Sequence, residues 1–487
     1  MAEKITNILD HYPDYEATIG IEVHVQLKTA SKMFCSCPTS FGQKPNTNIC
    51  PVCAGHPGTL PVPNRKAVDY AIMAGLATNC EISSESDFAR KHYMYPDLPK
   101  NYQITQGDIA LCMRGHVPTT TIDGKEKMVG LTRIHMEEDA GKAMHMSHGK
   151  SFVDLNRAGT PLIEIVSDPD ISNAHEARNY LVNLRNIMLY LGVSDVNMEE
   201  GSFRADINIS VKKKGAKKLG TRCEIKNVNS FKFIVQAINY EIERQIEVLE
   251  DGGAVVQATR LWNEKDQKTV FMRGKSDADD YRYFTDPDLP IIKVDSAWLE
   301  RIKAQIPELP LQKKNRLMRD YQVTEYEADI LVQDRAIARY FEEAVRFCEE
   351  PKLVTNWLLR DVLGYMKEHK IAIEQFPVTA ELLAGLIDKI SDGTINTKAA
   401  QEVFTAMTST GKDASTLIKE KGLEQMSNSA QLLEICEKIV NDNPEVVAQY
   451  KGGKDRMIGF FVGQAMKATQ GRGNPKMIND IFKELLS

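Results

Sequence analysis

The sequence predicts an α+β protein of several domains, with a sheet-rich first half followed by helical parts. Up to about residue 295, apolar and polar residues alternate in short segments such as ATIGIEVHVQL, DINISVK and CEIKNV, and this alternation is typical of strands. From about residue 297 onward, the apolar residues follow helical spacing, as in YEADILVQDRAIARYFEEAV. With 487 residues, of which 42% are apolar, the chain can form two or three ordinary hydrophobic cores.

Two helices are predicted inside the sheet-rich half. One runs from about residue 174 to residue 191, with Asn173 as its N-cap. The other opens near Ser230, carries an apolar stripe at helical spacing and stops at the glycine pair 252 to 253. Residues 277 to 290 are rich in Asp and Pro and are predicted to form a loop, so we expect the first domain to end near residue 296. Turn-forming residues at 391 to 396 and at 410 to 415 predict a further border in the helical half.

The formal net charge of −6 excludes a protein coated in basic surface, because affinity for nucleic acid rests on neutralising phosphates with Lys and Arg. Any RNA contact is therefore expected at a local basic stretch. The lysines of residues 212 to 218 alternate with glycines as in a hairpin turn, and we interpret them as a solvated loop. A second basic stretch is opposed only by Asp455, and it contains Lys451, Lys454, Arg456, Lys467, Arg472 and Lys476.

Targeting signals and disulfides are not expected. The chain begins without an apolar signal segment, and no stretch approaches the roughly 18 apolar residues that a membrane span needs. The nine cysteines are an odd total with isolated members, which is not the pattern of a disulfide framework. These features predict a cytoplasmic protein that has no membrane partner.

The sharpest local signal is a pair of cysteine pairs within residues 35 to 53. Cys35 and Cys37 are followed after twelve residues by Cys50 and Cys53, and two close thiolate pairs can surround one Zn²⁺ tetrahedrally. The alternative is four reduced cysteines in a core, but Gly, Pro and Asn rather than apolar residues fill the segment between them. The spacing therefore predicts a closed, structural zinc site rather than a catalytic one.

Acidic residues and one histidine predict a second metal site. Alternation along the strand places Glu22 and His24 on the same face, and a carboxylate beside an imidazole suits a divalent cation. Further acidic groups occur at residues 137 to 139 and 199 to 200, and such groups can hold Mg²⁺ for phosphoryl transfer if the fold brings them together. Solvated surface is the alternative for each group. The chain lacks a P-loop, a GxGxxG and a GxSxG, so an ordinary P-loop NTPase and a self-sufficient glutaminase are excluded.

Together these motifs resemble one family, the B subunits (GatB) of the heterotrimeric aspartyl/glutamyl-tRNA(Asn/Gln) amidotransferases. The matching segments are IGIEVHVQLKTASKMFC, PVCAGHPGTLPVPN, KHYMYPDLPKNYQITQ, IHMEEDAGK, NRAGTPLIEIVSDPD, MEEGSFRADINIS, EIKNVNSF and DDYRYFTDPDLP. The C-terminal run GFFVGQAMKATQGRGNP also resembles the tail domain of the family. The resemblance covers essentially the whole chain.

The resemblance implies an architecture and an activity. It implies a cradle-shaped, kinase-like catalytic domain at residues 1 to 296 with the zinc loop at 35 to 53, a helical domain at 297 to 410, and a YqeY-like, tRNA-binding tail domain at 411 to 487. The implied reaction is the ATP-dependent phosphorylation of the side-chain carboxylate of Glu-tRNA(Gln) or Asp-tRNA(Asn). Ammonia from the amidase A subunit then displaces the phosphate, and a small C subunit holds A and B together.

The resemblance also implies roles for particular residues. Glu22, His24 and Glu137 are expected to bind Mg²⁺ at the active centre, with Glu138 and Glu199 as weaker candidates, and Glu137 and Glu138 also match the region where ammonia enters. The expected ATP contacts are Arg204, Asp206 and Lys226, for which a structural ion pair is the alternative. The expected tRNA contacts are Lys451, Lys454, Arg456, Lys467 and Arg472.

Two other functions compete with this interpretation. One is a tRNA-docking scaffold whose acidic residues are only surface. The other is the related archaeal subunit that works with an asparaginase-like partner; it carries an inserted domain for which residues 270 to 310 leave no room. We therefore reject the archaeal type on length.

Overall fold

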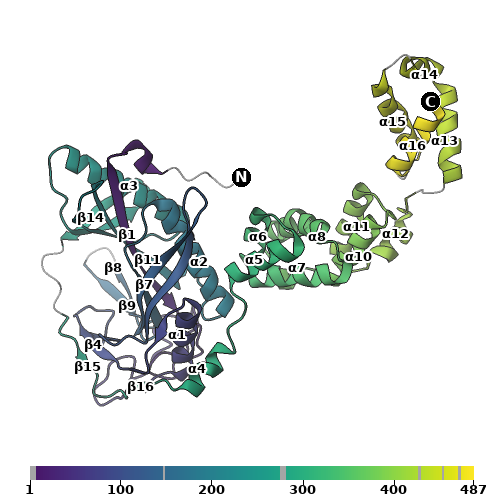
Figure 1. Ribbon diagram of the computed structural model, residues 1–487. Helices are drawn as coiled ribbons and strands as arrows, with labels where there is room; N and C mark the ends of the chain where they lie inside the picture. Colours follow the sequence, from purple (N-terminus) through teal and green to yellow (C-terminus); the bar gives the residue numbers. More distant parts are fainter. Residues whose placement is uncertain are drawn as a thin grey trace. The chain divides into compact units, whose positions relative to one another are not determined.

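The computed structural model describes residues 7–145, 149–274, 281–425, 429–451, 454–469 and 473–486. The chain divides into two compact units, Met1–Pro310 and Leu311–Ser487, which correspond to the purple-to-teal and the green-to-yellow parts of Figure 1. The first unit contains all the named strands, and the named elements that follow it, from α5 on, are helices. This division confirms the predicted α+β class, with a sheet-rich part followed by a helical part.

The first unit is built on a twelve-stranded sheet with the order β14-β13-β12-β11-β1-β10-β7-β5-β4-β15, and β6 joins β7 to β2. All neighbouring strands are antiparallel except β12 and β13. Two small sheets, β16 with β3 and β8 with β9, accompany it. The strands are β1 (Tyr15–Gln26), β2 (Glu81–Ile82), β3 (Glu85–Ser86), β4 (Ala89–His92), β5 (Tyr102–Thr105), β6 (Cys112–Thr120), β7 (Glu126–Glu138), β8 (Lys142–His145), β9 (Ser151–Asp154), β10 (Pro161–Ser167), β11 (Phe203–Lys213), β12 (Cys223–Lys226), β13 (Ala258–Asn263), β14 (Lys268–Gly274), β15 (Phe284–Thr285) and β16 (Ile292–Lys293).

The long central strand β1 separates an apolar face from a polar one. Its burial alternates residue by residue, so that Ile21 and Val23 are fully buried while Glu22 and His24 stay partly open. The apolar residues join the core that the sheet forms with helices α1 (Arg65–Ala77), α2 (Ala174–Leu191), α3 (Phe231–Glu250) and α4 (Ser296–Lys303). The other face of β1 is therefore free to carry a polar site.

The two helices predicted within the sheet-rich half are confirmed. In α2, the Asn173 side chain accepts a hydrogen bond from the Glu176 amide, and in α3, Ser230 caps the Phe233 amide. The apolar stripe of α3 lies in the core, where Ile234, Ile238, Ile242 and Ile246 are fully buried and Leu249 is partly buried. Its C-terminus is followed by Gly252, whose φ of +77° is a backbone conformation that glycine adopts without strain.

The structure confirms one of two predicted loop segments and differs from the prediction in the other. Lys213 ends β11, the chain turns at Gly215 with a φ of +79°, and β12 returns antiparallel, which confirms the hairpin. Of the predicted loop at 277 to 290, residues 277 to 280 lie outside the described residues. The remainder contains the short strand β15, because Phe284 and Thr285 pair with β4. This pairing was not predicted.

The second unit contains helices α5 (Pro310–Tyr321), α6 (Glu325–Leu331), α7 (Arg335–Cys348), α8 (Pro351–Trp357), α9 (Leu363–His369), α10 (Ala380–Ser391), α11 (Thr397–Thr410), α12 (Ala414–Lys421), α13 (Ser429–Asp442), α14 (Pro444–Lys451), α15 (Ile458–Ala468) and α16 (Pro475–Leu486). Their buried residues form two separate hydrophobic clusters. One draws on α5 to α12 and the other on α13 to α16, so this half has two cores. In the described residues, no helix combines the length and apolar character needed to cross a membrane.

The borders of the two compact units and of the two helical clusters lie later in the chain than the borders expected for the domains, which stay a prediction. The first unit continues past residue 296 to Pro310, because α4 buries Ile302 in the core of the sheet. The turns at 391 to 396 and 410 to 415 do not separate cores, because α12 buries Leu417 and Ile418 in the same cluster as α10 and α11. The second cluster begins only with Leu432 in α13.

Candidate active site

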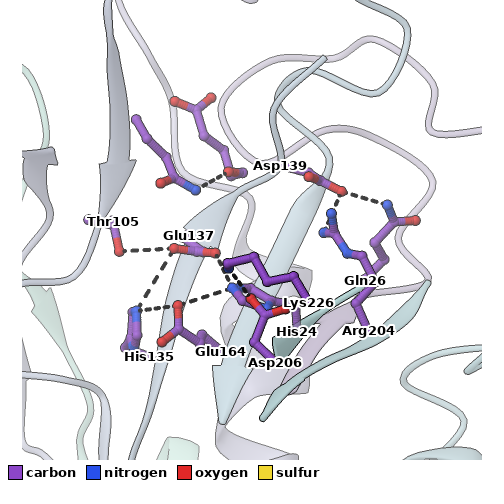
Figure 2. Close-up of polar contacts among 12 residues, drawn as sticks. His24, Gln26, Thr105, His135, Glu137, Asp139, Glu164, Arg204, Asp206 and Lys226 are labelled. Atoms are coloured by element: carbon purple, nitrogen blue, oxygen red, sulfur yellow. Dashed lines mark hydrogen bonds and ion pairs between the residues drawn. The ribbon is translucent and has the colours of Figure 1, made fainter. Parts of the chain in front are cut away.

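Three adjacent strands bring a histidine and two carboxylates together on the polar face of the sheet. His24 in β1 stands directly opposite Glu164 in β10, and Leu162, two residues before Glu164, stands opposite Glu137 in β7. The His24 Nε2 atom lies 3.2 Å from Glu164 Oε2 and 3.6 Å from Glu137 Oε1. Figure 2 shows the three side chains pointing toward one another. Their ligand atoms all lie within 4.8 Å of each other, which fits one shared divalent cation.

The charges of this group are strongly coupled. Burial acts to lower the pKa of His24, but the hydrogen bond to Glu164 and the charge of Glu137 outweigh it and raise the pKa to about 9. Burial and the charge of Glu164 raise the pKa of Glu137 to about 7. Burial also acts to raise the pKa of Glu164, but the hydrogen bond from His24 holds it below its usual range. The pocket therefore concentrates negative charge that a cation, here the His24 imidazolium, compensates.

A second histidine, His135, lies beside the cluster but is not one of its three converging ligands. Its Nε2 atom lies 3.7 Å from Glu164 and 3.9 Å from Glu137, and burial lowers the pKa of His135 to about 4. The ring is therefore neutral at physiological pH. Its Nδ1 atom is buried and has no hydrogen-bond partner among the described residues.

The other predicted metal ligands lie apart from this group. Glu22 shares the face of His24, but its carboxylate accepts a hydrogen bond from Asn208 and is not one of the three converging ligands. Burial and the charges of Glu164 and Asp206 raise the pKa of Glu22, so the Glu22 carboxylate lies within the electrostatic field of the acidic pocket. Glu199 lines a different hollow, together with Gln26. Neither residue is among the three converging ligands.

Glu138 is directed to the opposite side of β7 from Glu137, because neighbouring residues of a strand alternate in direction. Its Oε1 atom accepts from Lys100 Nζ at 2.5 Å and from the Ile104 amide at 3.0 Å. It lines a cavity of about 230 Å³ that also touches Cys35 and Cys53. The sequence groups Glu137 with Glu138, whereas the structure places only Glu137 in the acidic pocket.

Glu164 is the converging carboxylate that sequence reasoning missed. It is the only charged residue in the strand PLIEIVS, between the buried Ile163 and Ile165. A lone carboxylate in an otherwise apolar central strand was the available signal, because charge in such a strand is costly without a partner.

The predicted ATP contacts line the same pocket as the cluster. This pocket has a volume of about 480 Å³ and is lined by His24, Lys91, Tyr93, Gln103, Glu137, Asp139, Ala140, Leu162, Glu164, Arg204, Ala205, Asp206, Lys226, Asn227, Val228, Asn229 and Leu261. Arg204 Nη2 lies 2.9 Å from Asp139, and Lys226 Nζ lies 2.5 Å from Asp206 (Figure 2). Burial acts to lower the pKa of Lys226, but Asp206 and Glu224 outweigh it and raise the pKa. The pocket thus combines carboxylates that suit a divalent cation with two cations that suit phosphate oxygens.

The four cysteines also converge. Their sulfur atoms lie within 4.8 Å of one another, and the Cys50 and Cys53 sulfurs are 4.0 Å apart. Tetrahedral zinc with Zn–S bonds of about 2.3 Å requires sulfurs about 3.8 Å apart, so the spacing fits. The fully buried Lys32 places Nζ 3.5 Å from Cys53, where its charge offsets part of the thiolate charge. The hydrogen bond from Cys35, which outweighs burial, lowers the pKa of Cys53 to about 4.

The predicted tRNA contacts lie on the surface of the part of the helical unit that contains α14 and α15. The side chains of Lys451, Lys454, Arg456 and Lys467 are exposed, and they form no ion pair within the part of the chain that the structure describes. Arg472 lies outside the described residues.

Comparisons with known proteins cover both units. Residues 17–300 match the GatB/GatE catalytic domain family, and residues 339–486 match the family described as GatB domain. The chain is also similar to the B subunits of aspartyl/glutamyl-tRNA(Asn/Gln) amidotransferases from several bacteria. It is 51% identical to that of Persephonella marina over 97% of this chain and 100% of the relative. It is 50% identical to that of Syntrophotalea carbinolica and 49% to that of Carboxydothermus hydrogenoformans, each over 97% of this chain and 99% of the relative.

Proposed function

Because the chain belongs to the family of amidotransferase B subunits that act on aspartyl- and glutamyl-tRNA, we propose that its acidic pocket activates the side-chain carboxylate of Glu-tRNA(Gln), Asp-tRNA(Asn) or both with ATP. The observation that carries the proposal is the convergence of His24, Glu137 and Glu164 in a pocket that also contains Arg204 and Lys226. The enzyme class is a ligase that forms a C–N bond with ammonia derived from glutamine.

The chemistry requires activation because ammonia cannot expel an oxide from a carboxylate. In the proposed reaction, a carboxylate oxygen of the aminoacyl group forms a bond to the terminal phosphorus of ATP. The bond between that phosphorus and the oxygen that leaves with ADP breaks. Ammonia then attacks the acyl carbon, phosphate leaves with the electrons of the C–O bond, and the proton lost from nitrogen is taken up by the released phosphate. Mg²⁺, when bound, would neutralise the crowded anionic oxygens.

The chain's own residues have separable tasks in this reaction. His24, Glu137 and Glu164 would hold the cation, and binding it would release the proton that His24 otherwise carries at Nε2. Arg204 and Lys226 would meet phosphate oxygens from the neighbouring strands β11 and β12. Asp139 and Asp206, which now pair with them, fix their positions at the pocket.

The proposal is tested by assembling the full chain with an amidase A subunit and a C subunit and following amidation of each mischarged tRNA. We expect product only when ATP, Mg²⁺ and either glutamine or ammonium are present. If tRNA binds but His24→Ala amidates as fast as the natural protein, the chain is a docking scaffold and the proposal is wrong.

We propose that the exposed basic residues of the segment from α14 to α15 bind the body of the tRNA. Replacing Lys451, Lys454, Arg456 and Lys467 with Ala is expected to weaken tRNA binding, because each removes a charge that can meet a phosphate. The slope of log affinity against log salt should fall by roughly one for each phosphate-binding cation that is removed. Filter binding at several salt concentrations measures both quantities.

The hairpin turn offers a matched control for this prediction. Lys213, Lys214, Lys217 and Lys218 are equally numerous and exposed, and we interpret them as a solvated loop. Their replacement with Ala should leave the salt slope unchanged. An equal loss of affinity in both variants would show that binding depends on net charge rather than on the segment from α14 to α15.

We further propose that Cys35, Cys37, Cys50 and Cys53 hold a structural zinc ion, because their sulfurs are spaced for a closed tetrahedral site. Zinc at that site would fix the loop of residues 35 to 53 and would take no part in the reaction. We also propose a cytoplasmic location, which follows from a role in translation.

A further inference from the structure

A row of tyrosines begins at the acidic pocket with Tyr93, and the reaction described above leaves it unused. Tyr93, Tyr281 and Tyr283 form a row of edge-to-face contacts, with ring centroids 6.3 Å apart for the first pair and 6.0 Å for the second. Lys91 Nζ lies 4.8 Å from the Tyr281 ring centroid. These four residues are called the tyrosine wall below.

The segment that carries Tyr281 and Tyr283 is tied to β4 by backbone pairing and ion pairs. β15 pairs with β4, and the His92 amide donates to the Tyr281 carbonyl at 2.9 Å. Arg90, on the other side of β4, ties the two segments together through Asp286 at 2.7 Å and Asp288 at 2.9 Å. The backbone that carries Tyr281 and Tyr283 is therefore tied to β4.

The tyrosine wall borders the metal-binding cluster. Lys91 and Tyr93 line the same pocket as His24, Glu137 and Glu164. Burial and the charges of Glu137 and Glu164 raise the pKa of Tyr283 to about 12, so its ring stays neutral beside them. Tyr283 is nevertheless half exposed (51%), so a ligand can reach it.

We propose that the tyrosine wall stacks the unpaired 3′-terminal base of the aminoacyl-tRNA and that Lys91 meets a neighbouring phosphate; this inference rests on the proposed function. The aminoacyl group is esterified to the terminal ribose, so the base must lie within reach of the cluster when the carboxylate occupies it. Proteins bind single-stranded RNA by stacking its bases on aromatic side chains beside cations.

The adenine of ATP offers the same stacking chemistry, but the distribution of charge favours the RNA. The triphosphate needs several cations, and Arg204 and Lys226 lie together on strands β11 and β12. The tyrosine wall contains the single cation Lys91, which suits one phosphodiester. The nucleotide is therefore assigned to the side of Arg204 and Lys226, and the RNA base to the tyrosine wall.

The test uses an RNA hairpin that carries a tRNA acceptor stem and ends in 2-aminopurine, a base whose fluorescence is quenched by stacking. With the full chain, we expect quenching that excess ATP does not reverse. Tyr283→Ala should abolish the quenching and weaken binding by about five- to 150-fold, since stacking contributes about 1–3 kcal/mol per base. Tyr283→Phe keeps the ring and should behave like the natural protein.

Two controls separate stacking from general damage. Phe284→Ala removes a similarly exposed ring (48%) from the other side of β15, and Tyr326→Ala removes an exposed tyrosine (65%) from the helical unit. Both variants should quench normally. If Tyr283→Ala fails to fold, the quenching of 2-aminopurine by the natural chain, measured with and without ATP, still tests the inference.

Three results would overturn the inference: no quenching by the natural chain, unchanged quenching by folded Tyr283→Ala, or recovery of fluorescence on adding ATP, which would assign the tyrosine wall to the nucleotide. Amidation by the assembled natural complex is followed in parallel. Amidation without quenching refutes the tyrosine wall alone, whereas quenching without ATP-dependent amidation refutes the proposed function.

Discussion

Glu164→Gln is expected to lower ATP-dependent amidation by at least about 100-fold. The amide keeps the size of the side chain but removes a negative charge from the three-ligand cluster. Replacing even an outer partner of a metal ligand typically costs about 10–100-fold, so a direct ligand should cost more. The rate should be measured with ammonium in place of glutamine, so that ammonia production and delivery by the A subunit do not affect the result.

Glu199→Gln is the matched control for this substitution. Glu199 is a carboxylate that the sequence nominates for the metal, but it lines a different hollow. The control should keep a normal rate. A Glu164→Gln variant that retains a rate within about twofold of the natural protein would show that the cluster does not hold the metal used in catalysis.

Cys53→Ser is expected to remove the zinc and to lower the thermal stability of the first unit. Structural zinc contributes about 10–16 kcal/mol to the folding of small zinc-binding peptides, so losing one thiolate should cost much of the local stability of residues 35 to 53. Lys32 would also lose the thiolate that compensates its buried charge. Metal analysis by mass spectrometry and the thermal unfolding midpoint measure the two effects.

Cys348→Ser provides the control, because Cys348 is a half-buried cysteine of the helical unit far from the zinc loop in sequence. It should keep about one zinc per chain. A natural protein purified without zinc, or a Cys53→Ser variant with a full zinc content, would rule out the proposed site.

The sequence predicts the local elements well, because their signals are local. The caps at Asn173 and Ser230 and the alternation along β1 are determined by nearby residues, and the structure confirms them. The domain borders are less predictable. Whether α4 or α12 packs on one core or the next depends on which apolar surface is left uncovered, and that surface is built by distant segments.

The site could be predicted only in part, for the same reason. His24 and Glu137 stand out in their motifs, but only the antiparallel register of β1 and β10 places Glu164 opposite His24. The motif cannot separate Glu137 from Glu138, whereas strand alternation directs them to opposite sides. The tyrosine wall depends on the pairing of β15 with β4, within a segment that composition predicts to be a loop.

The central claim is that His24, Glu137 and Glu164 hold the cation that serves phosphoryl transfer from ATP. The most direct test is a crystal structure of the assembled complex with Mn²⁺ and a non-hydrolysable ATP analogue, in which anomalous scattering locates the metal. The account predicts an anomalous peak about 2.0–2.3 Å from His24 Nε2 and from an oxygen of each glutamate, next to the terminal phosphate. A nucleotide-bound Mn²⁺ peak elsewhere, with these three side chains unligated, would contradict it.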